Sequence, residues 1–133
     1  MTRRGQVATW AAVLVAVASG AAATPPVVRK TTLEDQPFPA PYHTTTVRTV
    51  IAAGGDVPPH THPGLEMAYV LYGTASVTVA GQAPVTLRAG YSMAIPEGRV
   101  HSVHNAGRGA LAIVSTYVVR AGEPIATPAA TAN

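Results

Sequence analysis

Short runs of alternating apolar and polar residues dominate the chain after residue 24. They are rich in Val, Thr, Tyr and Ile, and they are separated by Gly, Pro or Asn. This pattern is typical of β-strands, because side chains on a strand point alternately to its two faces. No segment after residue 24 has the period and the capping residues of a helix. The runs cover residues 44–51, 67–72, 75–80, 85–87, 92–95 and 110–119.

These runs predict an all-β fold, a jelly-roll barrel of two packed antiparallel sheets. Gly, Ala and Asn residues at 54–55, 80–81 and 105–109 supply the turns. With 133 residues, of which 47% are apolar and 11% charged, the chain can bury about two-thirds of its unfolded surface in one core. We therefore expect a single barrel domain over residues 44–119.

Residues 1–23 have the pattern of a secretory signal peptide. Arg3 and Arg4 precede an apolar stretch at residues 8–18, and small residues at 19–23 form a cleavage site of A-x-A type. This predicts an exported protein, periplasmic or secreted, that has no membrane association after cleavage. A membrane span is the competing interpretation, although the stretch is shorter than the ~20 residues that a span needs. The two arginines also resemble the start of a twin-arginine signal, but the bulky apolar residues that should follow are absent.

The segments that flank the barrel differ from it in composition. Residues 24–43 are Pro-rich and charged, which predicts an extended N-terminal arm. A second subunit is one candidate partner for this arm, so a homodimer is a hypothesis. Residues 120–133 are rich in Ala, Thr and Pro, which predicts a flexible C-terminal tail.

The charge of the chain gives no support for a nucleic-acid partner. The formal net charge of +3 includes Arg3 and Arg4, so the chain after residue 23 has seven basic and six acidic side chains. Its arginines are scattered and do not form a basic patch interleaved with aromatic residues. The chain has no cysteine, which excludes disulfides and thiolate metal ligands.

Three histidines and one glutamate have the spacing of metal ligands. His60 and His62 are separated by one residue, so on a strand their imidazoles face the same side, about 6–7 Å apart along the backbone. A turn at residues 63–65 follows, and Glu66 begins the next apolar run. His101 follows a later turn that contains Pro and Gly. We expect all four side chains to converge on one ion.

Three imidazoles and a carboxylate suit one divalent ion of Mn, Fe, Ni, Cu, Co or Zn better than calcium or magnesium. Four protein ligands could close a tetrahedral shell around zinc, or leave positions open on a five- or six-coordinate ion. Chemistry at the ion requires an open position.

The four ligands belong to two longer patterns. The first is Gly54, five residues, His60-Thr61-His62, three residues, Glu66, six residues and Gly73; the second is Gly90, five residues, Pro96, one residue, Gly98, two residues, His101, three residues and Asn105. The chain resembles small single-domain bacterial cupins, because every fixed position of both motifs of the cupin superfamily is filled. The resemblance implies a cupin-type double-stranded β-helix, one ion held by His60, His62, Glu66 and His101, and a pocket beside the ion. It does not imply a reaction, since cupins have many functions.

Three further polar residues are predicted to lie outside the site. His104 comes three residues after His101, so on a strand it points to the opposite face. His43 follows the arm and is predicted to be a surface residue, with contact to a partner as the alternative. Arg48 shares a strand face with Thr46 and is predicted to point outward.

The pocket wall is predicted to include Val70, Met93, Ile95 and Tyr117, although plain barrel core is an open alternative for Val70 and Met93. The first functional hypothesis is a small metalloenzyme, of oxygenase, isomerase or lyase type, that acts on a small organic molecule beside the ion. In it, Glu66 is a ligand that could detach and act as a base. The alternative is a non-catalytic cupin in which the ion braces the barrel or presents a site for a small ligand.

Overall fold

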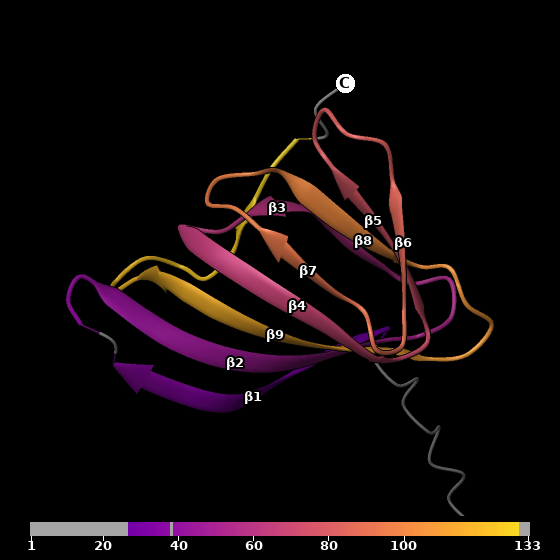
Figure 1. Cartoon of the computed structure of the whole chain (residues 1–133), viewed down its shortest axis with the longest axis horizontal. Helices are drawn as coiled ribbons and strands as arrows, with labels where there is room; N and C mark the ends of the chain where they lie inside the picture. Colours follow the sequence, from indigo (N-terminus) through magenta and orange to yellow (C-terminus); the bar gives the residue numbers. More distant parts are fainter. Residues whose placement is uncertain (1–26, 38, 131–133) are drawn as a thin grey trace, which may run out of the picture.

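The computed structural model describes residues 27–37 and 39–130, which form ten strands in two antiparallel sheets. The first sheet contains, in spatial order, β1 (Val28–Pro37), β2 (Tyr42–Ile51), β9 (Leu111–Arg120), β4 (Gly64–Tyr72) and β7 (Ser92–Ile95). The second sheet contains β10 (Thr127–Pro128), β3 (Asp56–Thr61), β8 (His101–Asn105), β5 (Thr74–Val79) and β6 (Val85–Arg88). Figure 1 shows the two sheets facing each other, with β1 at the outer edge of the first.

The predicted all-β jelly roll is confirmed. Four of the six apolar runs lie within β2, β4, β6 and β7. The other two match β5 and β9 with a shift of one residue. No described residue is in a helix, so the described part of the chain has no helix that could cross a membrane. The predicted signal peptide, residues 1–23, lies outside the described residues.

Alternation along the strands builds the core between the sheets. On β2, Thr45, Val47, Thr49 and Ile51 are buried, whereas the residues between them are half-buried. Arg48 lies on the outer side of the sheet, as predicted, and its guanidinium donates to the Tyr72 hydroxyl at 3.3 Å. The largest core cluster joins both sheets through Ile51, Val70, Ala75, Val77, Val79, Leu87, Leu111 and Ile113.

The N-terminal arm forms part of the barrel. Residues 28–37 of the expected arm are strand β1, which pairs along its length with β2 of the same chain. The arm had no strand prediction because it carries charged residues in place of an apolar run. Charged residues on an edge strand protect it from pairing with other chains, and β1 is such an edge.

The C-terminal segment also differs from the expected flexible tail. It leaves the end of β9 and crosses to the second sheet, where Thr127 and Pro128 pair with Thr61 and His60 of β3. Figure 1 shows this yellow segment running from β9 up to the side of β3. Two residues of strand are too few to leave an alternation pattern in the sequence.

The fixed glycines of the two motifs share one conformation. Gly54, Gly73, Gly90 and Gly98 all have positive φ, between 70° and 89°. At Gly73 a side chain would also collide with the backbone, because a Cβ atom there would lie 2.8 Å from the carbonyl oxygen of Ala110. The motif glycines therefore shape the turns that bring the metal-ligand strands together.

Candidate metal centre

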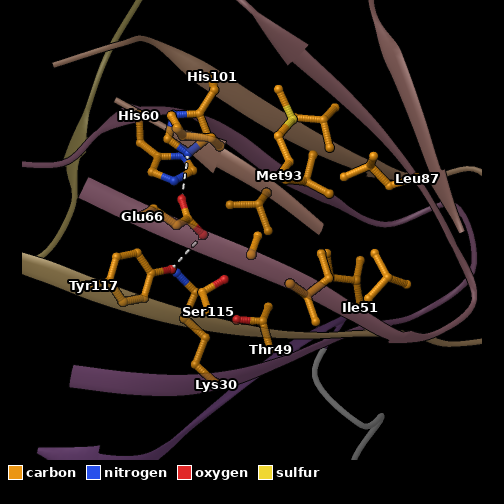
Figure 2. Close-up of a pocket in the computed structure, with 17 residues that line it drawn as sticks. Lys30, Thr49, Ile51, His60, Glu66, Leu87, Met93, His101, Ser115 and Tyr117 are labelled. Atoms are coloured by element: carbon orange, nitrogen blue, oxygen red, sulfur yellow. Dashed lines mark hydrogen bonds and ion pairs between the residues drawn. The ribbon is translucent and has the colours of Figure 1, made fainter. Parts of the chain in front are cut away.

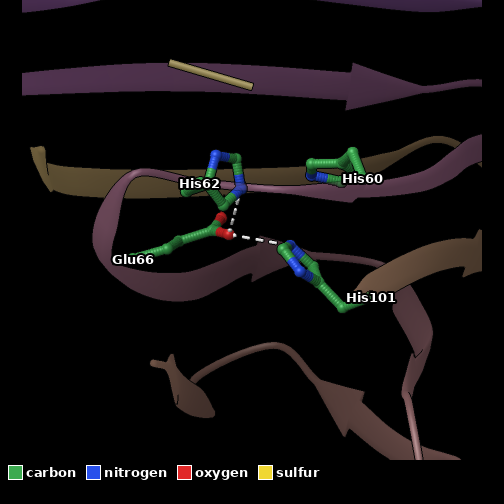
Figure 3. Close-up of side chains that lie close together, drawn as sticks. All are labelled: His60, His62, Glu66 and His101. Atoms are coloured by element: carbon green, nitrogen blue, oxygen red, sulfur yellow. Dashed lines mark hydrogen bonds and ion pairs between the residues drawn. The ribbon is translucent and has the colours of Figure 1, made fainter. Parts of the chain in front are cut away.

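The structure brings together the four side chains that the spacing singles out. His60 lies on β3, His62 directly follows β3, Glu66 lies on β4 and His101 begins β8. One potential ligand atom from each lies within 4.8 Å of the others. Figure 3 shows the three imidazole rings gathered around the Glu66 carboxylate. The cluster could hold a single metal ion, and it joins β4 of the first sheet to β3 and β8 of the second.

Two prolines help to position the histidines of β3. Pro58 and Pro59 have no N–H groups for the sheet, and the pairing of β3 with β8 shifts register between Val57 and His60. The same irregularity turns the Pro58 carbonyl toward the His60 ring, whose Nδ1 lies 2.8 Å from it. A bulge of this kind re-aims a side chain toward a site.

Backbone carbonyls hold Nδ1 of all three rings. His60 Nδ1 is 2.8 Å from the Pro58 oxygen, His62 Nδ1 is 2.5 Å from the Ile125 oxygen, and His101 Nδ1 is 2.9 Å from the Arg99 oxygen. Because a carbonyl oxygen can only accept, each Nδ1 carries the proton and donates it. Nε2 of each neutral ring then keeps a free lone pair, which is the arrangement of metal-bound histidines.

The Nε2 atoms of His62 and His101 face the Glu66 carboxylate, which has no proton to donate to them. His62 Nε2 and His101 Nε2 lie 3.0 Å and 3.1 Å from Oε2 of Glu66. A lone pair on nitrogen and a carboxylate oxygen repel at this distance unless a proton or a cation lies between them. His62 Nε2 is buried, and this atom makes no hydrogen bond in the described structure. A divalent cation would satisfy this nitrogen and the carboxylate together, so the residues present fit a metal ion.

The electrostatics of the cluster favour the metal-binding forms of Glu66 and His60. Burial acts to raise the pKa of Glu66, but the adjoining His101, His62 and Ser115 side chains hold that pKa well below its usual range. Burial lowers the pKa of His60 to about 4, so this ring is neutral near pH 7. Burial also opposes the charged form of His101, but its contacts with Glu66 and the Arg99 carbonyl raise its pKa. A metal ion on Nε2 would compete with the proton that these contacts favour on His101.

A cavity opens on the inner side of Glu66, between the two sheets. All four predicted pocket residues, Val70, Met93, Ile95 and Tyr117, line it. Its volume is about 40 Å³, which is room for about three water molecules. The Tyr117 hydroxyl donates to Oε1 of Glu66 at 3.1 Å. Burial and the negative charge of Glu66 both raise the pKa of Tyr117. Figure 2 shows Glu66, His60 and His101 at one end of the cavity and Leu87 and Met93 at the other.

Several polar groups of the site were not found from the sequence. Thr49 and Ser115 are buried and line the cavity, and Lys30 of β1 reaches it from the edge of the first sheet. Ser115 shares a strand face with Tyr117, so alternation along the last strand could have found it. The Ile125 carbonyl that holds His62 is a backbone atom and leaves no signal in the sequence.

Two other histidines lie apart from the centre. His104 is exposed on β8 and its Nδ1 lies 2.8 Å from Asp56, as expected for the face opposite His101. His43 is half-buried on β2 and contacts Asp35 of β1, so its partner is in the same chain. Neither residue belongs to the described metal-ligand cluster.

Fold and site together define a small β-barrel protein with a candidate mononuclear metal centre. The model of the Cupin domain family matches residues 47–117, which is just over half of the chain. The chain belongs to the cupin family.

Similar proteins share parts of this barrel. Germin-like protein subfamily 3 member 1 of Arabidopsis thaliana is 35% identical over 78 residues, which are 55% of this chain and 38% of that protein. The chain thus spans well under half the length of this relative. A structure of oxalate oxidase is 26% identical with a TM-score of 0.59, and the match covers 74% of this chain and 54% of that one. A double-stranded β-helix protein from Klebsiella pneumoniae is 18% identical with a TM-score of 0.63, over 75% of this chain and 84% of that one, and shows the fold alone.

Proposed function

We propose that this protein is an exported, mononuclear metal-binding cupin that acts as a small metalloenzyme on a small organic molecule. The observation that carries the proposal is the buried His62 Nε2, which makes no hydrogen bond in the described structure and faces the Glu66 carboxylate at 3.0 Å. His60, His62, Glu66 and His101 would hold the ion. A bound divalent ion would supply Lewis acidity or redox chemistry next to the cavity.

The cavity supports an enzymatic role for this centre. Glu66 is both a candidate ligand and part of the cavity wall, so a molecule in the cavity would meet its carboxylate. The Tyr117 hydroxyl donates to this carboxylate, and the side chains of Val70, Met93 and Ile95 give the cavity beside it an apolar wall. Glu66 is thus placed to take a proton from a bound molecule. The similarity to oxalate oxidase supports a small oxygenated substrate, and it leaves oxidation, isomerisation and cleavage as alternatives.

A non-catalytic cupin is the second candidate, and one observation favours it. The four ligands come from both sheets, so an ion there would tie β4 to β3 and β8. In such a protein the ion would brace the barrel, or present a site for a small ligand, without any turnover.

The two candidates predict different behaviour toward a small metal-binding probe. We expect nitric oxide to change the spectrum of the Fe²⁺ form, and azide to change that of the Co²⁺ form, because an enzyme keeps an exchangeable position on its ion. Glu66→Gln should abolish turnover on a panel of phenolic, keto-acid and sugar substrates but only weaken metal binding, since the amide oxygen can ligate but cannot take a proton.

Glu97→Gln is the matched control, because Glu97 is a half-exposed carboxylate whose partner is Arg120, outside the metal-ligand cluster. This variant should behave like the unchanged protein. Spectra that do not respond to either probe, together with no turnover on the panel, would favour the bracing role.

Export is the part of the proposal that rests on residues 1–23 alone. We expect the mature chain to begin at Thr24, or within a residue or two of it because Pro25 disfavours the cut. Mass spectrometry of protein from the periplasm or the medium measures this directly. Recovery of only the full-length chain in the membrane fraction would support the membrane-span interpretation instead.

A further inference from the structure

A lysine from the N-terminal strand reaches the cavity that adjoins the metal-ligand cluster. Lys30 of β1 lies directly opposite Thr49 of β2, and directly opposed residues of an antiparallel pair project to the same face of the sheet. Thr49 is buried and lines the cavity, so this face is the inner one. Figure 2 shows the Lys30 side chain extending past Thr49 toward Ser115, and all three residues line the cavity.

The charge of Lys30 has no acidic partner in the described structure. None of the ion pairs among residues 27–37 and 39–130 includes this ammonium group. All six Asp and Glu residues of the sequence lie within those ranges. Lys30 is also the one Lys or Arg among the described residues that line this cavity. A cation in this position attracts an anion into the cavity.

The cavity has one polar and one apolar end. Thr49, Ser115 and Tyr117 lie on the side of Glu66, whereas Ile51, Leu87 and Met93 form the far wall (Figure 2). A ligand that matches this lining has a charged head and a short hydrocarbon part. The volume of about 40 Å³ restricts it to a few heavy atoms.

We propose that the cavity binds a short-chain carboxylate, with the carboxylate group held between Lys30 and the metal centre and the hydrocarbon part against the apolar wall. The inference rests on the proposed function, because the bound ion supplies part of the positive charge. A divalent ion, the Glu66 carboxylate and the Lys30 ammonium together leave a surplus of positive charge that a carboxylate ligand partly neutralises. Lys30 then acts as a specificity residue that selects anionic over neutral molecules of the same shape.

The test compares propionate with propionamide, which has nearly the same shape and no charge. The full chain after signal cleavage is loaded with Zn²⁺, its metal content is measured, and each compound is titrated at low ionic strength while backbone amide signals are followed by NMR. We expect propionate to bind more tightly than propionamide and to shift the signals of Thr49 and Ser115. Lys30→Met should weaken propionate binding about tenfold or more and leave propionamide binding and metal content unchanged.

Two further variants complete the test. Lys30→Arg keeps the charge and should restore most of the preference for propionate. Arg29→Met removes the same charge from the neighbouring position, which lies opposite Val50 on the outer face, and should have little effect. Equal binding of propionate by the unchanged protein and Lys30→Met, or no preference over propionamide, would overturn the inference and leave the metal site standing. Failure of the unchanged protein to take up an ion would instead overturn the proposed function.

Discussion

Replacing His101 with alanine is expected to abolish the stabilisation of the barrel by metal. In the unchanged protein, metal at about 100 times its dissociation constant should add about 2.7 kcal/mol to the free energy of unfolding, because the ion binds only the folded chain. His101 is buried and contributes one of the clustered Nε2 atoms, so its loss leaves a cavity and three ligands. Thermal unfolding with added metal and with chelator measures the effect as a difference within each variant. That difference should be close to zero for His101→Ala.

His104→Ala is the matched control for this experiment. His104 lies three residues further along β8, is exposed, and contacts Asp56 outside the cluster. Its replacement should preserve the full difference between metal and chelator. His101→Gln, which keeps more of the side-chain volume, separates loss of the ligand from loss of packing. A metal-dependent shift of full size in both His101 variants would contradict the ligand assignment.

Replacing Asn105 with alanine should produce the largest loss of stability without touching the metal ligands. Asn105, the last fixed position of the second motif, is 1% exposed. The two N–H groups of its amide donate to the carbonyls of Ile51, Ala52 and Gly109 at 2.8–3.1 Å, with one hydrogen shared between two of them, and its amide oxygen accepts from Gly107 N at 2.9 Å. At about 1 kcal/mol for each lost bond, we expect the free energy of unfolding to fall by roughly 3 to 4 kcal/mol. Urea unfolding of the metal-free protein measures this loss.

A second variant shows which half of the amide is responsible. Asn105→Asp keeps the oxygen that accepts from Gly107 but replaces the donor by a second acceptor, which faces three carbonyls. It should destabilise the protein at least as much as Asn105→Ala. His104→Ala, at the preceding exposed position, should change stability by less than about 0.5 kcal/mol. A loss below about 1 kcal/mol for Asn105→Ala would show that this network is not an anchor of the fold.

The metal-ligand cluster could be predicted from the sequence because strand geometry puts His60 and His62 on one face, and the resemblance to the two cupin motifs implies that Glu66 and His101 join them. His60 and His62 lie two positions apart, and the turn before Glu66 and the turn before His101 contain Pro or Gly. Alternation along the apolar runs likewise predicted that Val70, Met93, Ile95 and Tyr117 face the cavity, where the structure places them. In these cases the local pattern and the tertiary contacts agree.

The elements that the sequence did not reveal are those that depend on contacts distant in the chain. Strand β1 carries the exposed residues Lys30 and Asp35 opposite the buried Thr49 and Thr45, so its composition resembles that of a solvated segment. Its register with β2, which places Lys30 beside Thr49, shifts at Leu33 and could not be derived from local alternation. The C-terminal segment is held by pairing with β3 and by the bond from His62 to the Ile125 carbonyl, and neither has a local signal.

The central claim is that one divalent ion is held by the three histidines and Glu66. Its most direct test is elemental analysis of the purified protein, combined with X-ray absorption at the edge of the metal that is found. We predict close to one ion per chain, surrounded by nitrogen and oxygen ligands that include three imidazoles, and loss of most of that ion in the double variant His62→Ala/His101→Ala. A folded double variant that still holds one ion per chain, or an unchanged protein that takes up none of the candidate metals, would contradict the claim.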